Sequence, residues 1–310
     1  MSFPVITVQL HSSTQLEQLG TKAKFWYQSG DNCQMLFKEG RPGTGENWAE
    51  KVCCEIARLL AVPHAEYELA IFNEKQGVVS PSFVPKNGRL ILGNELLAST
   101  DSSYQTSVRY KSAQHVLNRV IVVLQRTSIE TPRNWSKPSA INNAVGVFAG
   151  YLLLDALVGN QDRHDENWGV VAAASLDGTG DKLALAPTFD HASSLGRNET
   201  DENRRARLIT IDDGYSIEKY VEKARSGLFE NKGSKKSMGG LQAFRECAKL
   251  ELSAGQYWLE RLREIKDSDF SDIIGSIPDS FISQDAREFA NAMLRINRNR
   301  LLSLNGTSHT

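Results

Sequence analysis

The hydrophobic pattern changes along the chain, and this change limits the fold more than any other feature of the sequence. Before about residue 95 the pattern predicts short strands around a single helix. The predicted strands span residues 23–27, 34–37, 67–72 and 78–84. Between the two pairs of strands, Trp48, Val52 and Ile56 recur at helical spacing, and Pro63 ends this helix. The first part of the chain is therefore expected to be a small domain of mixed α and β structure.

From Tyr110 onwards the pattern is mainly helical. The predicted helices span residues 112–126, 140–158, 241–252, 257–265 and 285–302. Ser283 is placed near the N-cap of the last helix. We therefore expect an α+β protein with a small mixed N-terminal lobe, residues 1–95, and a larger helical C-terminal lobe, residues 96–310.

A hairpin and two loops are predicted between these helices. Strands at residues 168–174 and 183–185 flank a turn at residues 177–180. Residues 197–207 and 231–237 are polar, charged and poor in apolar anchors. Because such segments have little apolar surface to bury, we expect mobile loops there.

The composition excludes some functions. Among 310 residues, 36 are Lys or Arg and 37 are Asp or Glu, so a net charge of -1 gives no reason to expect direct binding to nucleic acid. The apolar stretch at residues 145–158 is interrupted by Asp155 and is shorter than the ~20 residues that cross a bilayer, so it predicts a buried helix. The start of the chain does not resemble a signal peptide, and four cysteines without a Cys-x-x-Cys pair predict free thiols. We expect a cytoplasmic location.

The clearest chemical signal is the segment from Gly159 to Asn167, which is followed by Asp190. Phosphoryl transfer needs metal ions on a triphosphate, a cation on its phosphates, and a carboxylate that orients the attacking hydroxyl. Asp162 and Asn167 stand five positions apart, which is the spacing between the base and the metal-binding Asn of a kinase catalytic loop. Asp190 adds a second carboxylate after a strand-like stretch, and this oxygen-only set suits Mg²⁺ better than zinc.

Each of these residues also has a local structural interpretation. Asp162 and Asn167 could belong to a turn at the end of a helix, where both residue types are common. Asp190 could be the N-cap of a helix, because Ser193 and Ser194 follow it. The combination, with its order and spacing, favours a catalytic centre over separate structural roles.

The same residues resemble a known family. Asp162-Arg163-His164-x-x-Asn167 followed by Phe189-Asp190 resembles the catalytic and metal-binding pair of HipA-like serine/threonine kinases. The first motif is also similar to that of phosphatidylinositol 3/4-kinases. Further resemblance to the lysine strand and adjoining helix of HipA-like proteins lies at residues 36–39, 45–51 and 60–63. The likeness spans about residues 20–195 and implies a two-lobed protein-kinase-like fold with ATP between the lobes, near a hinge at residues 79–87.

The resemblance implies roles for the second part of the motif. Asp162 would be the catalytic aspartate, and Asn167 and Asp190 would be the ligands of Mg²⁺. His164 is a further candidate catalytic residue that could orient a phosphate, or it could hold the loop through a hydrogen bond to the backbone. Arg163 is expected to order the loop through an ion pair.

Lys38 is the residue that the resemblance places on the α- and β-phosphates of ATP. The alternative is a solubilising lysine at a strand edge, but Phe37 beside it indicates an apolar strand. The partner of Lys38 on the following helix would be Glu50. Glu46 and Glu55 lie in or near the same helix and are the alternatives.

The sequence departs from the protein-kinase pattern in two places. No Gly-x-Gly-x-x-Gly loop precedes Lys38, and the nearest turn offers only Gly20, with Lys24 close by. These two residues could bind phosphate through backbone N–H groups and charge, or they could form an ordinary surface turn. Asp190 is followed by His191-Ala192 where eukaryotic protein kinases have Phe-Gly, which is similar to HipA-like and lipid kinases.

The resemblance thus implies an ATP- and magnesium-dependent kinase that phosphorylates a serine or threonine hydroxyl of a protein, as HipA-like toxins do. It leaves an antitoxin partner possible. A kinase of lipids or of small-molecule alcohols is the alternative among enzymes. A nucleotide-binding module with little or no catalytic activity is the alternative from another class.

Overall fold

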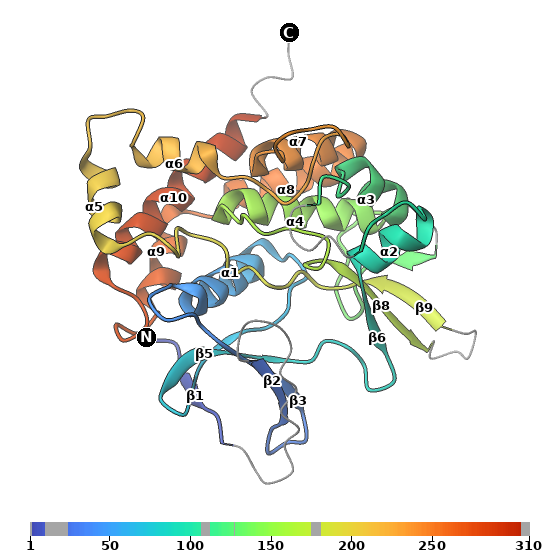
Figure 1. Ribbon diagram of the computed structural model, residues 1–310, viewed down its shortest axis with the longest axis horizontal. Helices are drawn as coiled ribbons and strands as arrows, with labels where there is room; N and C mark the ends of the chain where they lie inside the picture. The colour runs from blue at the N-terminus through green and yellow to red at the C-terminus, as the bar shows by residue number, and fades with distance from the viewer. Residues whose placement is uncertain (1, 10–23, 107–111, 127, 175–180, 305–310) are drawn as a thin grey trace.

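The computed structural model of the protein describes residues 2–9, 24–106, 112–126, 128–174 and 181–304. Two separate β-sheets and a set of helices build the molecule. The first sheet lies at one end of the molecule and the helices gather at the other, with the second sheet beside them (Figure 1). The structure therefore separates a small sheet-rich part from a larger helical part, as the sequence predicted.

The first sheet comes from the N-terminal part of the chain. Its strands are β1 (Val5–Thr7), β2 (Lys24–Gln28), β3 (Gln34–Glu39), β4 (Glu68–Phe72) and β5 (Lys75–Pro81). They lie in the order β1-β4-β5-β3-β2, and only the β1–β4 pair is parallel among them. The β2–β3 pair and the β4–β5 pair confirm the four strands that the sequence predicted.

One face of this sheet carries a small aromatic core. Phe25 on β2 lies opposite Phe37 on β3, and their ring centroids are 5.2 Å apart. Phe72 packs edge-on against Phe25, with centroids 4.8 Å apart. Because side chains alternate along a strand, Lys38 and Phe37 lie on opposite faces of the sheet. The face of Lys38 is the one covered by α1 (Glu46–Leu60). The register of β3 therefore directs Lys38 towards the helix.

The helix α1 forms where the spacing of Trp48, Val52 and Ile56 predicted it. It ends in Ala61, which has a left-handed conformation with φ of 57°, and Pro63 follows shortly after. Twelve of its residues are buried, because the helix lies between the first sheet and the helical part. Its polar residues are consequently held in place by packing on both sides.

The second sheet joins distant parts of the chain. Its strands are β6 (Arg89–Leu92), β7 (Ile129–Glu130), β8 (Gly169–Ala174) and β9 (Asp181–Leu185), in the order β6-β8-β9-β7. The β8–β9 pair confirms the predicted second hairpin. β6 lies before residue 95 but pairs with β8, so the chain passes from the first sheet to the second between Pro81 and Arg89. The domain boundary at residue 95 remains a prediction.

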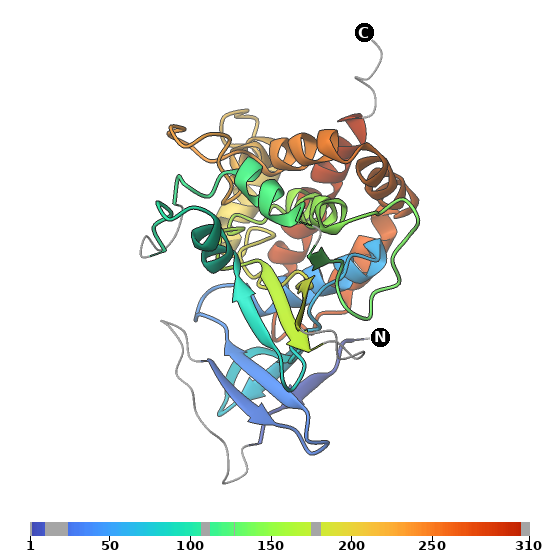
Figure 2. The ribbon, with the colours of Figure 1, turned by 90° about the vertical axis from the view of Figure 1, so that its right-hand side faces the viewer.

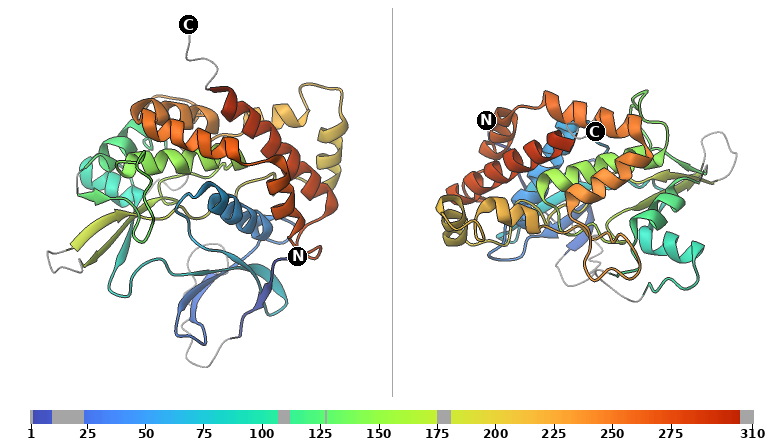
Figure 3. Two further views of the ribbon diagram at one scale, coloured as in Figure 1. Left: turned by 180° about the vertical axis from the view of Figure 1, so that it is seen from behind. Right: turned by 90° about the horizontal axis from the view of Figure 1, so that it is seen from above.

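The helix α4 (Ala144–Val158) is the centre of the larger part, and all 15 of its residues are buried. It packs against α7 (Gly240–Leu250), α8 (Leu252–Glu264) and α10 (Gln284–Leu302), and the views in Figures 2 and 3 show these helices around it. A Cβ atom at Gly150 would lie 2.5 Å from the Trp258 ring, so glycine permits the close approach of α8. The sequence prediction of a buried helix at this position is confirmed.

Further helices complete the larger part. They are α2 (Gly93–Thr100), α3 (Leu117–Leu124), α5 (Asp201–Ile209), α6 (Ile217–Lys223) and α9 (Asp267–Gly275). The helix expected at residues 112–126 forms only over the bounds of α3. Ser283 caps α10 as predicted, since its side chain accepts a hydrogen bond from the backbone N–H of Ala286. Among the described residues, no helix combines the length and the apolar character that a membrane crossing requires.

The prediction of a mobile loop at residues 197–207 was wrong, because α5 begins within it. The Thr200 side chain caps this helix by accepting a hydrogen bond from the N–H of Asn203. Arg204 pairs with Asp201 at 2.6 Å and donates to the backbone oxygen of Gly196 at 3.1 Å. Capping and ion pairs therefore order a segment in which apolar anchors are scarce.

Candidate active site

The loop after α4 begins where the helix ends. Gly159 adopts a left-handed conformation with φ of 65° and turns the chain out of the helix. Asn160 donates to the Oδ1 atom of Asp155 in the last turn of α4, at 2.8 Å. Arg163 donates to both carboxylate oxygens of Asp155, at 2.7 and 2.8 Å. The loop is thus tied back onto the buried helix from which it emerges.

Arg163 is fully buried, with 0% of its side chain exposed. Burial opposes its charge, but the Asp155 carboxylate outweighs this effect, and the pKa of Arg163 is raised. Its guanidinium also donates to the backbone oxygen of Asn167 and to the Oγ1 atom of Thr188, the latter at 2.9 Å. The expectation that Arg163 orders the loop through an ion pair is confirmed.

Asp162 and Asn167 lie on this loop and contact each other through the backbone. The Nδ2 atom of Asn167 donates to the backbone oxygen of Asp162 at 2.7 Å. The backbone N–H of Asp162 donates to the side chain of Asn160 at 3.0 Å, and its Oδ2 atom accepts from Ser193 at 3.4 Å. The spacing of five positions therefore closes a compact turn that fixes both side chains.

His164 contacts both the loop backbone and the carboxylate of Asp162. Its Nδ1 atom accepts a hydrogen bond from the backbone N–H of Glu166 at 3.1 Å, which holds the loop. Its Nε2 atom lies 3.7 Å from the Oδ1 atom of Asp162. When Nδ1 accepts, the proton of the neutral ring is on Nε2, so the imidazole can also face the Asp162 carboxylate as a donor.

Lys38 lies between two carboxylates. Its Nζ atom is 3.1 Å from the Oε2 atom of Glu50 on α1 and 2.8 Å from the Oδ1 atom of Asp190. Burial opposes the charge of Lys38, but Asp190 and then Glu50 outweigh it, so the pKa of Lys38 is raised well above its usual value. Burial raises the pKa of Glu50, and Lys38 opposes this shift.

Of the three candidate partners on α1, the structure pairs Lys38 with Glu50. Glu46 instead contacts Arg197 and accepts from the backbone N–H of Arg41. Glu55 lies further along the helix and pairs with Lys51 at 2.6 Å. The Oε1 atom of Glu50 also accepts from the backbone N–H of His191 at 2.7 Å, so this glutamate is held from two directions.

Asp190 has an unusual backbone, with φ of 59°. This left-handed conformation is uncommon outside glycine, but aspartate adopts it more readily than most residues, and six other non-glycine residues among those described share it. Its backbone N–H donates to the hydroxyl of Tyr67 at 3.4 Å, and the Nζ atom of Lys38 lies 5.6 Å from the centre of the Tyr67 ring. The preceding Phe189 stacks on Phe83, with ring centroids 5.7 Å apart.

Comparison with known proteins supports a kinase-like arrangement of these elements. No protein-family model and no curated protein matches the chain. Among solved structures, the Helicobacter pylori proinflammatory kinase CtkA matches with a TM-score of 0.70 at 20% identity, over 97% of this chain and 99% of that one. HipA from Shewanella oneidensis, solved with HipB and its operator DNA, matches with a TM-score of 0.57 at 13% identity, over 94% of this chain and 66% of that one.

The chain has a kinase-like fold. This confirms the α+β, two-lobed protein-kinase-like fold and, at the level of the fold, the likeness to HipA-like kinases. In this fold, residues from separate elements meet: Lys38 from β3, Glu50 from α1, and Asp190 from the loop after β9. Their roles in binding ATP and Mg²⁺ stay predictions.

Of the two residues predicted to bind phosphate before Lys38, Gly20 and Lys24, the structure describes only Lys24. Gly20 lies outside the described residues. Lys24 begins β2 and stands opposite Lys38 in the strand register, so the two side chains extend from the same face of the sheet. This position is compatible with the predicted contact of Lys24 with phosphate.

Sequence analysis missed residues that support the site from outside the motif. Tyr67 contacts the backbone of Asp190, and Ser193 links the Asp162 carboxylate to Arg197 through hydrogen bonds of 3.4 and 3.0 Å. Thr188 and His191 both contact Arg163. These residue types occur at many positions in any chain, and only their positions in space reveal their role.

Proposed function

We propose that this chain is an ATP- and magnesium-dependent protein kinase that transfers phosphate to a serine or threonine hydroxyl. The observation that carries the proposal is the contact of Lys38 with both Glu50 and Asp190, next to a loop that fixes Asp162 and Asn167. Phosphoryl transfer requires this set of groups: a cation for the phosphates, oxygen ligands for the metal, and a carboxylate for the hydroxyl.

Asp190 and Asn167 would hold the magnesium ion, which neutralises charge on the β- and γ-phosphates when it is bound. Their donor set fits this ion, because carboxylate and amide oxygens are the ligands that Mg²⁺ prefers. Asn167 donates through Nδ2 to the Asp162 backbone, and this contact leaves its Oδ1 atom as the one that would face a cation.

Lys38 and Asp162 would act on the substrates directly. Lys38 is held in its charged form by two carboxylates and would bind the α- and β-phosphates of ATP. Asp162 has 23% of its side chain exposed, so it can reach a hydroxyl of the acceptor and take its proton or orient it. His164, at 3.7 Å from Asp162, would help to fix the carboxylate.

The candidate partner is proposed from a solved structure with the same fold, and the substrate class from the motif. CtkA is described as a kinase, and HipA as part of a toxin–antitoxin system together with HipB. The HipB in that structure makes an antitoxin a candidate partner of this chain. We propose a protein substrate and a cytoplasmic location because the motif at Asp162 resembles that of HipA-like serine/threonine kinases. No direct contact with nucleic acid is part of the proposal.

The test uses the full-length protein with Mg²⁺, ATP labelled on its γ-phosphate, and a cell lysate. Labelled serine or threonine in lysate proteins, absent with Asp162→Ala, would support the proposal. Lys75→Met is the control, because this lysine is exposed and its ion-pair partner is Glu39, not Glu50 or Asp190. Label in the lipid fraction alone would indicate a lipid kinase. ATP binding with no transfer to any acceptor would indicate a nucleotide-binding module.

A further inference from the structure

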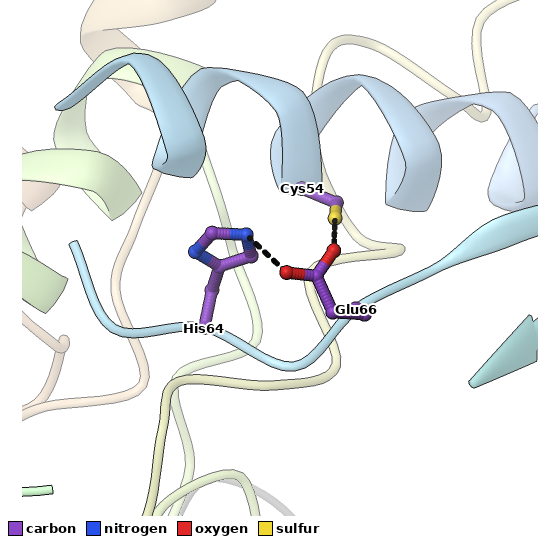
Figure 4. A group of neighbouring side chains, drawn as sticks. All are labelled: Cys54, His64 and Glu66. Carbon is purple, nitrogen blue, oxygen red and sulfur yellow. Dashed lines mark hydrogen bonds and ion pairs between the residues drawn. The ribbon is translucent and has the colours of Figure 1, made fainter. Parts of the chain in front are cut away.

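A second group of polar side chains lies at the far end of α1. Cys54 extends from α1, and His64 and Glu66 come from the segment that leads to β4, so the three side chains converge (Figure 4). The Sγ atom of Cys54 is 3.8 Å from the Oε2 atom of Glu66. The Nε2 atom of His64 is 3.5 Å from the Oε1 atom of Glu66. The candidate ligand atoms all lie within 4.8 Å of one another.

These separations can be compared with those of a zinc site. Zinc bound tetrahedrally at about 2.3 Å from sulfur and about 2.0 Å from nitrogen or oxygen places its ligands about 3.3–3.6 Å apart. The two observed distances, 3.5 and 3.8 Å, run to different oxygens of Glu66, and the three candidate ligand atoms lie within 4.8 Å of one another. The side chains must therefore move closer together to reach this geometry. A thiol, an imidazole and a carboxylate also form a mixed ligand set that suits zinc better than Mg²⁺ or Ca²⁺.

His64 gives an independent indication of a missing ligand. Its Nδ1 atom lies 2.6 Å from the backbone oxygen of Val62 and must carry the proton that is donated there. In the neutral ring, Nε2 then carries a lone pair, and it faces Glu66. The Nε2 atom is buried and has no hydrogen-bond partner among the described residues. Only 10% of the side chain is exposed. A histidine that donates one nitrogen to a backbone carbonyl commonly binds a metal through the other.

The surroundings of the cluster suit a metal ion. The Sγ atom of Cys54 accepts a hydrogen bond from the backbone N–H of Tyr67 at 3.4 Å, which fixes the position of the sulfur. His64 and Glu66 also line a groove of about 800 Å³, which gives a path of entry and room for a fourth ligand such as water. Arg58 contacts Glu66 and would be displaced on metal binding.

We propose that Cys54, His64 and Glu66 form a zinc-binding site with one position open to the groove. The site is separate from the candidate active site, but it is built on the same elements. The segment of His64 pairs with the segment between β9 and Asp190: the backbone N–H of Ala65 donates to the backbone oxygen of Thr188, and that of Thr188 donates to the backbone oxygen of Pro63, both at 2.9 Å. Zinc would therefore fix the end of α1 against the segment that leads to Asp190.

The test measures zinc binding by the full-length protein, without ATP. Protein treated with a chelator and kept reduced is titrated with Zn²⁺ against a zinc-sensitive indicator, and with Co²⁺ to detect a thiolate-to-metal absorption band. We expect one equivalent of zinc to bind and to raise the melting temperature, since a ligand that binds only the folded state stabilises it. Because ATP is absent, the result is independent of the proposed kinase activity.

Variants identify the ligands. Cys54→Ala and Glu66→Gln should each weaken zinc binding by at least about tenfold, and Cys54→Ala should abolish the cobalt band. Glu66→Gln keeps the test valid if Cys54→Ala fails to fold, because 49% of the Glu66 side chain is exposed. Cys33→Ser, at an exposed cysteine, and Cys247→Ser, at a buried one, are the controls.

The alternative is an ordinary ion pair between Glu66 and its cationic neighbours beside a buried thiol. In that case the protein would bind no zinc at micromolar concentrations, or Cys54→Ala would bind it as the wild type does. Either result would overturn the proposal. Arg58→Gln removes the competing guanidinium and should tighten zinc binding; weaker binding by this variant would also contradict the site.

Discussion

The Nη2 atom of Arg163 lies 2.9 Å from the Nε2 atom of His191, and this contact joins the loop after α4 to the loop of Asp190. The two loops are separated by the β8–β9 hairpin in the sequence. Burial and the positive charge of Arg163 lower the pKa of His191 to about 3, so the imidazole is neutral and can accept a hydrogen bond from the guanidinium. The position of the Asp162 loop relative to the Asp190 loop thus depends on the fully buried side chain of Arg163.

Replacing Arg163 should therefore destabilise the whole protein. Arg163→Met leaves Asp155 buried, with 2% of its side chain exposed and no cation, and we expect a loss of about 3–5 kcal/mol in the free energy of unfolding measured with urea. The double variant Arg163→Met/Asp155→Leu should recover part of this loss. Arg89→Met removes an exposed ion pair with Glu95 and should cost less than about 1 kcal/mol. Equal effects of Arg163→Met and Arg89→Met would contradict the interpretation.

Lys38→Met should affect activity and stability separately. Phosphate transfer should fall by roughly a hundredfold, because the variant lacks the cation for the phosphates. Stability should fall by about 3 kcal/mol, because Glu50, with 1% of its side chain exposed, would face Asp190 without a cation. Lys38→Met/Glu50→Gln should recover stability but not transfer. If the double variant regains transfer, the role of Lys38 is structural.

Asp162→Asn tests the catalytic role directly. The variant should lower turnover by about a hundredfold or more with little change in ATP affinity, because the carboxylate acts mainly in the transition state. Helix capping does not explain this residue, since α4 ends at Gly159. Single-turnover transfer beside ATP titration measures both quantities, with Asp31→Asn in an exposed turn as the control. Transfer near the wild-type rate would remove Asp162 from the mechanism.

The stability of the protein should fall in acid partly through His115. This buried imidazole lies with Nδ1 3.0 Å from the Gly227 oxygen, while Nε2 accepts from Trp168 at 3.0 Å, so the folded state holds the neutral ring. Burial lowers the pKa of His115 from 6.5 to about 4. Its stabilising contribution is present above pH 6.5 and is lost as the pH falls towards 4, because the unfolded chain binds the proton first.

The expected contribution of His115 between pH 7 and pH 5 is about 2 kcal/mol. His115→Asn can keep a donor towards Gly227 but removes the titrating group, so the pH dependence of the unfolding free energy should become weaker by about this amount. Urea unfolding at both pH values measures it. If the free energy of unfolding of His115→Asn changes with pH as that of the wild type does, then His115 is protonated in the folded protein, or other groups cause the loss of stability in acid.

The sequence alone determined the elements and the motif. Hydrophobic spacing located α1, α4, α10 and the two hairpins, because their burial patterns are local properties of the chain. The loop residues Asp162 and Asn167 were also readable, since their spacing places them in one turn. The prediction failed at α5, where capping and charge pairs replace the apolar pattern that it depends on.

Only the tertiary structure decided which residues meet. It placed Glu50, and not Glu46 or Glu55, beside Lys38. Glu46 and Glu50 share a face of α1 because they are four positions apart, so the place where β3 passes along the helix decides between them. The tertiary structure also brought His64 and Glu66 to Cys54, and Tyr67 to Asp190. Contacts of this kind depend on how separate elements pack together, and the pattern within each element carries no information about that packing.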